Sequence, residues 1–437
     1  MTDNTTELYF GTTAQKTTDA EKLPVVLLAL DQGKYDMTRS LDELRALADA
    51  NGMDAVAEVV QKRSTPEAAT LLGEGKVAEA RLVCQNVNAA AAIFDGELTG
   101  SQIRNLSAAL QVEVLDRTML ILEIFRARAT TNEGKLQTEL ATLRYQLPRL
   151  QGLGESLSRQ GGGGGGSGGA RRGAGETKLE LDRRHLHHRI EHLEGRLKEL
   201  EKRRGETRRA RQKNNVPVVA LVGYTNVGKS SLLNALCGEQ IFEADMLFAT
   251  LDPTARKLVL PSGLQIILVD TVGFVSRLPH HLVEAFKSTL EEVSEADLIV
   301  HVVDGSHPDP FSQIEAVDDV LSDIDGVETI PTIIVFNKVD RMDEATRERI
   351  EALMPEAYIV SAFSGEGVDE LRMQVESMLP TPNVHVEALL PYTAGSLVSR
   401  VREYGKVINV EYRDDGMMLE AEVDDHLAAQ IVEQSIG

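Results

Sequence analysis

The chain is 437 residues long and 42% hydrophobic, a content typical of a globular protein with room for about three domains. Its formal net charge of −22 argues against indiscriminate binding to nucleic acid. No apolar run is long enough to span a membrane, no signal peptide begins the chain, and the isolated Cys84 and Cys237 fit neither a disulfide framework nor a zinc site, so we expect a cytoplasmic protein.

The first 116 residues combine a polar tail with an alternating pattern. Residues 1–23 are Thr-rich and aperiodic, so we expect a disordered tail. Over residues 24–116 short apolar runs alternate with helical stretches, which predicts an α/β domain with a small parallel sheet covered by helices. The expected strands are 25–30, 54–60, 90–94 and 112–115, and the expected helices are 39–51, 75–86 and 99–110.

Residues 117–213 have the pattern of a helical hairpin. An apolar heptad step occurs twice, at Leu136, Leu140, Leu143 and Leu147 and again at Leu186, Ile190, Leu193, Leu197 and Leu200. A flexible glycine run lies between the two, so we expect two helices of similar length to fold back as an antiparallel coiled coil with a tip loop at 152–174. Pro148 is expected to end the first repeat, and an arm of about thirty residues projects roughly 45 Å. The alternative is that both helices pack on neighbouring domains.

Basic residues gather at the ends of this hairpin. Arg159, Arg171 and Arg172 flank the glycines, so the tip is suited to RNA phosphates. Residues 202–213 form a second basic patch on an otherwise acidic chain. The alternative for that patch is a solvated linker helix.

From residue 214 the α/β alternation resumes. Residues 214–380 predict a second α/β domain, and residues 381–437 predict a small α+β domain with a hairpin turn at Asp414-Asp415-Gly416. The expected strands are 218–222, 257–260, 264–270, 298–304, 332–336, 357–360, 384–388, 406–412 and 417–423. The expected helices are 229–237, 280–294, 311–323, 343–353, 367–378, 394–403 and one from Asp424.

A phosphate-binding loop lies between the first strand and first helix of the second α/β domain. The apolar run 219–222 leads into G-x-x-x-x-G-K-S, which ends at Ser230 and opens a helix. In such a loop backbone N–H groups and the helix N-terminus surround the phosphates, Lys229 reaches the β- and γ-phosphates, and Ser230 ligates Mg²⁺. The candidate nucleotide contacts here are Gly223, Tyr224, Thr225, Asn226, Val227, Gly228, Lys229, Ser230 and Ser231.

Further elements follow in the order that a guanine-nucleotide switch requires. Asp270 ends an apolar strand and is expected to hold Mg²⁺, with the Gly273 amide near the γ-phosphate. The Asp340 carboxylate can accept N1–H and the exocyclic amine of guanine, donors that adenine lacks at those positions. Thr250, in the irregular stretch 243–256, is the candidate switch threonine and a third candidate metal ligand. The catalytic candidates are Lys229, Thr250 and Gly273. The remaining candidate GTP contacts are Phe248, Ala249, Leu251, Asp252, Thr271, Val272, Asn337, Lys338, Val339, Ser361, Ala362 (its amide facing guanine O6) and Phe363.

Two residues bear on the rate of hydrolysis. Phe274 follows Gly273 where many small GTPases place a water-orienting glutamine, so intrinsic hydrolysis should be slow. Asn226 either ligates a monovalent cation, K⁺, that supplies positive charge to the transition state, or has a plain hydrogen-bonding role.

The chain from about residue 24 to 380 resembles the HflX family of ribosome-associated GTPases. The resemblance is carried by Gln61-Lys62-Arg63 through Gly73-Glu74-Gly75-Lys76, Asp116-Arg117-Thr118, Ile121-Leu122-Glu123-Ile124-Phe125, Glu133-Gly134-Lys135-Leu136-Gln137, Tyr145-Gln146-Leu147-Pro148-Arg149-Leu150, Leu179-Glu180-Leu181-Asp182-Arg183-Arg184 and Phe248-Ala249-Thr250-Leu251-Asp252-Pro253-Thr254. It implies a Ras-like GTPase, acting as a monomer on the large ribosomal subunit, that splits or rescues stalled ribosomes or acts in ribosome biogenesis. It also implies that the hairpin loop is directed toward the peptidyl-transferase region and that ribosome binding speeds GTP hydrolysis.

Two rival functions stay open at this point. One is an RNA-remodelling ATPase that uses the N-terminal domain, where Gly73-Glu74-Gly75-Lys76 is the candidate loop. The other is a non-catalytic scaffold in which GTP only orders the switches.

Overall fold

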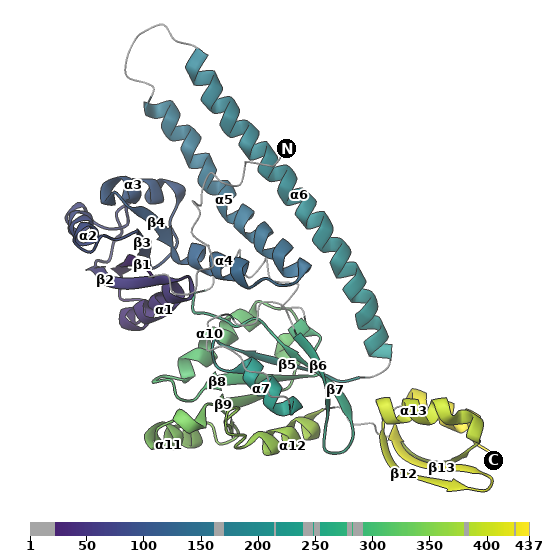
Figure 1. The fold of residues 1–437 in the computed structure, drawn as a ribbon. Helices are drawn as coiled ribbons and strands as arrows, with labels where there is room; N and C mark the ends of the chain where they lie inside the picture. The colour runs from purple at the N-terminus through teal and green to yellow at the C-terminus, as the bar shows by residue number, and fades with distance from the viewer. Residues whose placement is uncertain are drawn as a thin grey trace. The chain divides into compact units, whose positions relative to one another are not determined.

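The computed structural model describes residues 22–160, 170–213, 216–238, 248, 254–277, 282, 292–379, 384–423 and 425–436. The chain divides into two compact units, Met1–Leu120 and Ile121–Gly437, each of which is taken by itself (Figure 1). Among the described residues, no helix has both the length and the apolar character that a membrane crossing needs.

The first unit is the expected parallel sheet with helices. Its strand order is β2-β1-β3-β4, and β1 pairs in parallel with both β2 and β3. Val26 and Leu28 of β1 enter a buried cluster with Val77 of α2 and Leu106 of α3, because alternate residues of a strand point to the same face. The elements are β1 (Leu23–Asp31), α1 (Met37–Ala50), β2 (Met53–Lys62), α2 (Glu74–Asn86), β3 (Ala91–Phe94), α3 (Gly100–Leu110) and β4 (Glu113–Asp116).

The second unit begins within α4 (Arg117–Arg128). The two helices of the hairpin follow, α5 (Asn132–Gln160) and α6 (Ala170–Lys213). The α5–α6 seam is the predicted one, since its apolar cluster consists of Leu136, Leu140, Ile190 and Leu193 with Leu143, Leu147, Leu197 and Leu200 packed against it. Ion pairs cross the seam on its flanks, with Arg189 Nε 2.7 Å from Glu139 Oε1 and Arg144 Nη2 2.8 Å from Glu194 Oε1. The antiparallel coiled-coil prediction is therefore confirmed.

Two details of the hairpin prediction are wrong. The helices are unequal, 29 residues in α5 and 44 in α6. In addition, the predicted tip loop at 152–174 is too long, because α5 runs through Pro148 to Gln160 and α6 begins at Ala170. Leu147 lies in the seam just before the proline, so packing against α6 supports the turn that lacks the Pro148 N–H. The tip residues 161–169 lie outside the described residues.

Residues 218–378 of the second unit form a sheet with helices on both faces. Its strand order is β10-β9-β8-β5-β7-β6, in which only the β6–β7 pair among the described ladders is antiparallel. On one face Val300 and Val302 of β8 pack with α7 and α12, and on the other Ile299 packs with Val317 of α10. The elements are β5 (Val218–Gly223), α7 (Lys229–Cys237), β6 (Thr254–Val259), β7 (Gln265–Asp270), β8 (Leu298–Asp304), α10 (Phe311–Ser322), β9 (Thr332–Asn337), α11 (Glu344–Leu353), β10 (Tyr358–Ile359) and α12 (Val368–Met378), with 3₁₀ turns η1 (Val327–Thr329) and η2 (Val339–Arg341). The expected helix over 280–294 lies mostly outside the described residues.

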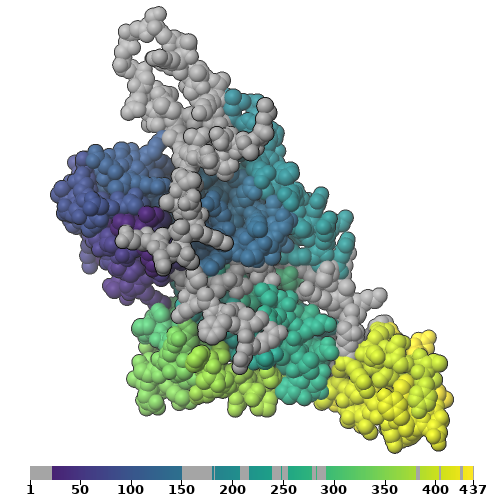
Figure 2. Space-filling view, viewed as in Figure 1, coloured from purple at the N-terminus to yellow at the C-terminus, as the bar shows by residue number. Residues whose placement is uncertain are grey.

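The C-terminal residues form a small α+β body, yellow in Figures 1 and 2. Its antiparallel strand order is β11-β13-β12, and β12 and β13 meet at the predicted turn, where Arg413 pairs with Gly416. One face of the sheet buries Leu419 and Ala421 against Val401 of α13 and Ile431 of α14. The elements are β11 (Val384–Leu390), η3 (Tyr392–Ala394), α13 (Gly395–Tyr404), β12 (Lys406–Arg413), β13 (Gly416–Val423) and α14 (Asp425–Gln434).

Candidate functional site

The predicted phosphate loop lies between the end of β5 and the start of α7, and its glycines are required by geometry. Gly228 has φ +87°, and a Cβ there would lie 2.5 Å from Asn337 Nδ2. A Cβ on Gly223 would lie 2.2 Å from the Val302 carbonyl oxygen. A larger residue at either position would therefore displace the neighbouring strand end or the Asn337 side chain.

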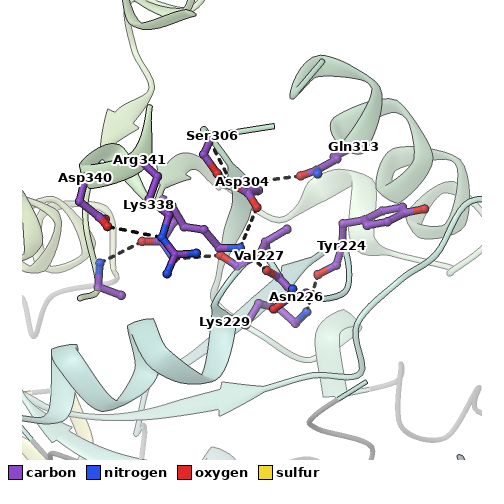
Figure 3. Close-up of polar contacts among 12 residues, drawn as sticks. Tyr224, Asn226, Val227, Lys229, Asp304, Ser306, Gln313, Lys338, Asp340 and Arg341 are labelled. Carbon is purple, nitrogen blue, oxygen red and sulfur yellow. Dashed lines mark hydrogen bonds and ion pairs between the residues drawn. The ribbon is translucent and has the colours of Figure 1, made fainter. Parts of the chain in front are cut away.

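Lys229 places a positive charge inside this loop. Its side chain is buried, and Nζ donates to the Gly223 carbonyl at 3.1 Å. Nζ also donates to the Tyr224 carbonyl at 2.9 Å (Figure 3). Burial lowers the pKa of Lys229 to about 8, against the opposing attraction of Asp270. A buried ammonium whose acceptors among the described residues are neutral carbonyls favours an anionic ligand at this point.

Ser230 and Asp270 meet beside that lysine. Asp270 is buried at the end of β7, and Ser230 Oγ donates to its Oδ2 at 2.5 Å. A hydroxyl and a carboxylate from two elements are hard oxygen donors, and this pair fits the few protein ligands that Mg²⁺ takes at a nucleotide. Thr250, the other predicted metal ligand, lies outside the described residues.

The segment after Asp270 lies directly against the phosphate loop. A Cβ on Gly273 would lie 2.9 Å from Thr225 Cα and 3.1 Å from Lys229 Nζ. The Phe274 amide donates to the Gly223 carbonyl at 3.1 Å, and its ring is buried in the cluster with Val222 and Ile299. Because that ring points into the core, it cannot orient a water molecule, as the sequence predicted.

The predicted base-recognition residues come together at the ends of β9 and β10. Asn337 Nδ2 donates to the Val227 carbonyl at 2.9 Å, and Asn337 Oδ1 accepts from the Ala362 amide at 2.9 Å. Ser361 Oγ donates to Asp340 Oδ1 at 2.6 Å, which orients that carboxylate. The Ala362 amide, expected to face guanine O6, is thus bonded to Asn337 here, and guanine would have to share or take over this donor.

Sequence reasoning missed Asp304, the last residue of β8. Lys338 Nζ donates to Asp304 Oδ2 at 2.7 Å and to the Asn226 carbonyl at 2.6 Å, so one ammonium ties the base-recognition turn to the phosphate loop (Figure 3). The Gln313 side chain accepts from the Asp304 amide at 3.0 Å and fixes this strand end. The available signal was that β7, β8 and β9 all end in an Asp or Asn, and parallel strands bring such residues to one edge.

The structure also shows how deeply the side chains of several other predicted contacts are buried. Thr271 is buried and its hydroxyl donates to the Leu221 carbonyl at 2.7 Å, and the side chains of Val272 and Val339 are buried as well. The Phe248 ring is buried edge-on against Phe125 of α4, with 4.7 Å between ring centroids, so only its backbone is available to a ligand. Ser231 and Phe363 are exposed. The candidates Ala249, Thr250, Leu251 and Asp252 lie outside the described residues.

His301 lies in the core of this domain and gives it a pH-dependent stability. Burial lowers its pKa to about 4, with a further contribution from the charge of Lys229, and Asp318, 3.8 Å from Nδ1, is too exposed to reverse this. Between pH 6.5 and 4 the unfolded chain therefore binds more protons at this residue than the folded chain. The stability contributed by neutral His301 is complete above pH 6.5 and is lost as the pH falls.

We expect His301→Leu to flatten this dependence. In wild type, His301 alone should lower the free energy of unfolding by about 2 kcal/mol between pH 7.5 and pH 5. Urea unfolding of both proteins at the two pH values measures the difference. Equal losses in wild type and variant would show that another group is responsible.

Comparison with known proteins gives consistent matches over most of the chain. Family models match for a GTP-binding GTPase N-terminal domain at residues 38–126, a GTP-binding GTPase middle region at 128–211 and a 50S ribosome-binding GTPase at 218–338. The GTPase HflX of Caldanaerobacter subterraneus subsp. tengcongensis is 46% identical over 403 residues, which cover 92% of this chain and 91% of that protein. The GTPase HflX of Lacrimispora saccharolytica is 44% identical, covering 94% and 96% of the two chains.

A solved structure shows a more distant likeness. A GTP-binding protein from Sulfolobus solfataricus in complex with GDP is 23% identical, with a TM-score of 0.42 over 82% of this chain and 98% of that one. The family assignment rests on the sequence matches, which exceed 40% identity over nearly the whole chain. The chain therefore belongs to the HflX family of GTPases and is a GTP-hydrolysing enzyme.

Proposed function

We propose that the protein couples hydrolysis of GTP, at the loop 223–230, to association with the large ribosomal subunit. In this proposal it acts in the cytoplasm as a monomer, and it either splits or rescues stalled ribosomes or serves ribosome biogenesis. The observation that carries the nucleotide site is the meeting of the loop, Asp270 and the 337–340 turn at one edge of the sheet. The ribosomal partner is supported by the match of residues 218–338 to the 50S ribosome-binding GTPase family.

Each residue of the site has a role in this proposal. Lys229 exchanges its carbonyl acceptors for the β- and γ-phosphates, and the Gly273 amide donates to the γ-phosphate. Ser230 and Asp270, with Thr250, would hold Mg²⁺, which neutralises charge that develops on the phosphates. Asp340, oriented by Ser361, accepts the two N–H donors of guanine.

A monovalent cation at the phosphate loop is a further part of the proposal. Asn226 has φ 62°, its side chain is exposed, and its carbonyl already accepts from Lys338, so its amide oxygen is available to K⁺. We expect kcat in potassium buffer to exceed kcat in sodium buffer by about tenfold, because a bound K⁺ adds one charge contact that stabilises the transition state. Asn226→Ala should remove the difference, whereas equal rates of the wild-type protein in both buffers would leave Asn226 with a hydrogen-bonding role only.

The hairpin is proposed as the arm that contacts ribosomal RNA. The α5–α6 seam is held by apolar packing and flanking ion pairs, and in the sequence arginines stand on both sides of the glycines between the two helices. Because arginine contacts to phosphate release counterions, affinity should fall steeply with salt. Arg171 and Arg172 are the residues that we expect to make such contacts.

Pelleting with purified large subunits tests this proposal. The variant with Arg171→Glu and Arg172→Glu should bind at least about tenfold more weakly. The slope of the logarithm of its binding constant against the logarithm of salt concentration should be smaller in magnitude by about two. Lys34→Glu with Lys62→Glu is the matched control, since both lysines are exposed in the first unit and the charge change is the same. Unchanged binding of the arginine variant would contradict a role for the tip.

A further inference from the structure

Thr225, in the middle of the phosphate loop, has a buried hydroxyl that the mechanism above does not use. The residue is 5% exposed, and its Oγ1 has no hydrogen-bond partner among the residues that the structure describes. Its amide is engaged, donating to the Phe274 carbonyl at 2.7 Å. Buried hydroxyls nearly always have partners in folded proteins, so this one is available to a group that the described residues do not supply.

The surroundings of Thr225 indicate which group that is. A Cβ built on Gly273 would lie 2.9 Å from both Cα and Cγ2 of Thr225 and 3.1 Å from Lys229 Nζ. Thr225 therefore lies beside Lys229 and Gly273, whose ammonium and amide are proposed to contact the terminal phosphate. The methyl group lies against Gly273, and a β-branched side chain packed in this way has a restricted χ1, which fixes the direction of the hydroxyl.

We propose that the Thr225 hydroxyl forms a hydrogen bond at the reacting end of GTP, to a γ-phosphate oxygen or to the attacking water, and that this contact speeds hydrolysis. The inference rests on the proposed nucleotide site. A hydroxyl both donates and accepts, so it can hold a water molecule in line or stabilise charge on the phosphoryl oxygens. Thr225 would thereby take the role of the water-orienting glutamine of other GTPases, a role that Phe274 cannot fill because its ring is buried in the core.

The reaction itself is unchanged by this assignment. The water oxygen forms a bond to the γ-phosphorus as the bond to the bridging oxygen of GDP breaks, and the protons of the water leave with phosphate or to solvent. Thr225 keeps its own proton throughout and contributes only a hydrogen bond that is stronger in the transition state than in the ground state.

Two substitutions separate the hydroxyl from the methyl group. Thr225→Val keeps the shape and removes the hydroxyl, whereas Thr225→Ser keeps the hydroxyl and removes the methyl. In single-turnover hydrolysis of GTP with Mg²⁺, we expect the valine variant to be slowed at least about tenfold and the serine variant less than about threefold. The Kd for GDP, which lacks the γ-phosphate, should change less than about twofold in both variants.

Affinity for a non-hydrolysable GTP analogue distinguishes the two hydrogen-bond partners. Weaker analogue binding by Thr225→Val assigns the contact to a γ-phosphate oxygen, and unchanged binding with slow hydrolysis assigns it to the water. The proposal would be overturned if the Thr225→Val variant hydrolysed GTP at the wild-type rate. It would also be overturned if the variant lost as much affinity for GDP as it lost in rate. If hydrolysis survives Lys229→Ala, the nucleotide site itself is misplaced, which is a separate failure.

Discussion

Lys229→Ala is expected to lower kcat/KM for GTP by at least about 100-fold. The substitution removes the ammonium that is buried inside the loop and held by the Gly223 and Tyr224 carbonyls, the positive charge proposed for the β- and γ-phosphates. The fold should tolerate the change, because burial disfavours this charge and lowers its pKa to about 8. Phosphate release at saturating and subsaturating GTP measures both kinetic constants.

The matched control for Lys229→Ala is Lys34→Ala, an exposed lysine in the first unit that should leave the rate unchanged. ATP turnover measured on the same samples addresses the rival RNA-remodelling ATPase. In that rival the N-terminal domain hydrolyses ATP, so turnover would survive the loss of Lys229. Full GTP hydrolysis by Lys229→Ala would refute the assignment of the loop 223–230 as the catalytic site.

Asp340→Asn is expected to change the base that the enzyme selects. The Asp340 carboxylate, oriented by Ser361 Oγ at 2.6 Å, can accept both N1–H and the exocyclic amine of guanine. The asparagine amide has one C=O acceptor and one NH₂ donor. Its NH₂ group would face the exocyclic amine of guanine, so two donors would be buried opposite each other without an acceptor. We expect GTP affinity to fall at least about 100-fold, since sites built around specific hydrogen bonds reject a mismatched partner strongly.

The same substitution should favour xanthine nucleotides, whose carbonyl at the position of the guanine amine accepts from the new amide. Competition of GTP and XTP for binding of a fluorescent nucleotide measures the switch. Asp343→Asn is the control, because Asp343 caps α11 through the Thr346 amide and lies in the same region of sequence. Equal loss of both nucleotides in Asp340→Asn would indicate local unfolding instead of a change in base recognition.

The sequence predicted the architecture well wherever a local pattern determines the structure. The loop could be predicted because Gly223 and Gly228 occupy positions that no larger residue fits, and the glycines are readable in sequence. Asp270 and the 337–340 turn could be predicted because strand-ending polar residues of a parallel sheet share one edge. The seam of the hairpin followed from its heptad step.

What could not be predicted depends on tertiary contacts. The continuation of α5 through Pro148 requires the packing of Leu147 against α6, which no local propensity contains. The burial of Phe248 against Phe125 joins residues more than a hundred positions apart in the chain. Asp304 was missed because its role comes from Lys338. That the Thr225 hydroxyl has no partner among the described residues can be known only from the folded structure.

The coupling of hydrolysis to the ribosome is tested most directly by phosphate release from GTP with and without purified large ribosomal subunits. Wild type should be stimulated strongly, and a protein with residues 159–172 replaced by a short turn should lose most of that stimulation while keeping its intrinsic rate. The intrinsic rate is the internal control, because the loop 223–230 is untouched. Absence of stimulation in wild type would contradict the large subunit as activator, and full stimulation of the shortened protein would contradict the hairpin as the coupling element.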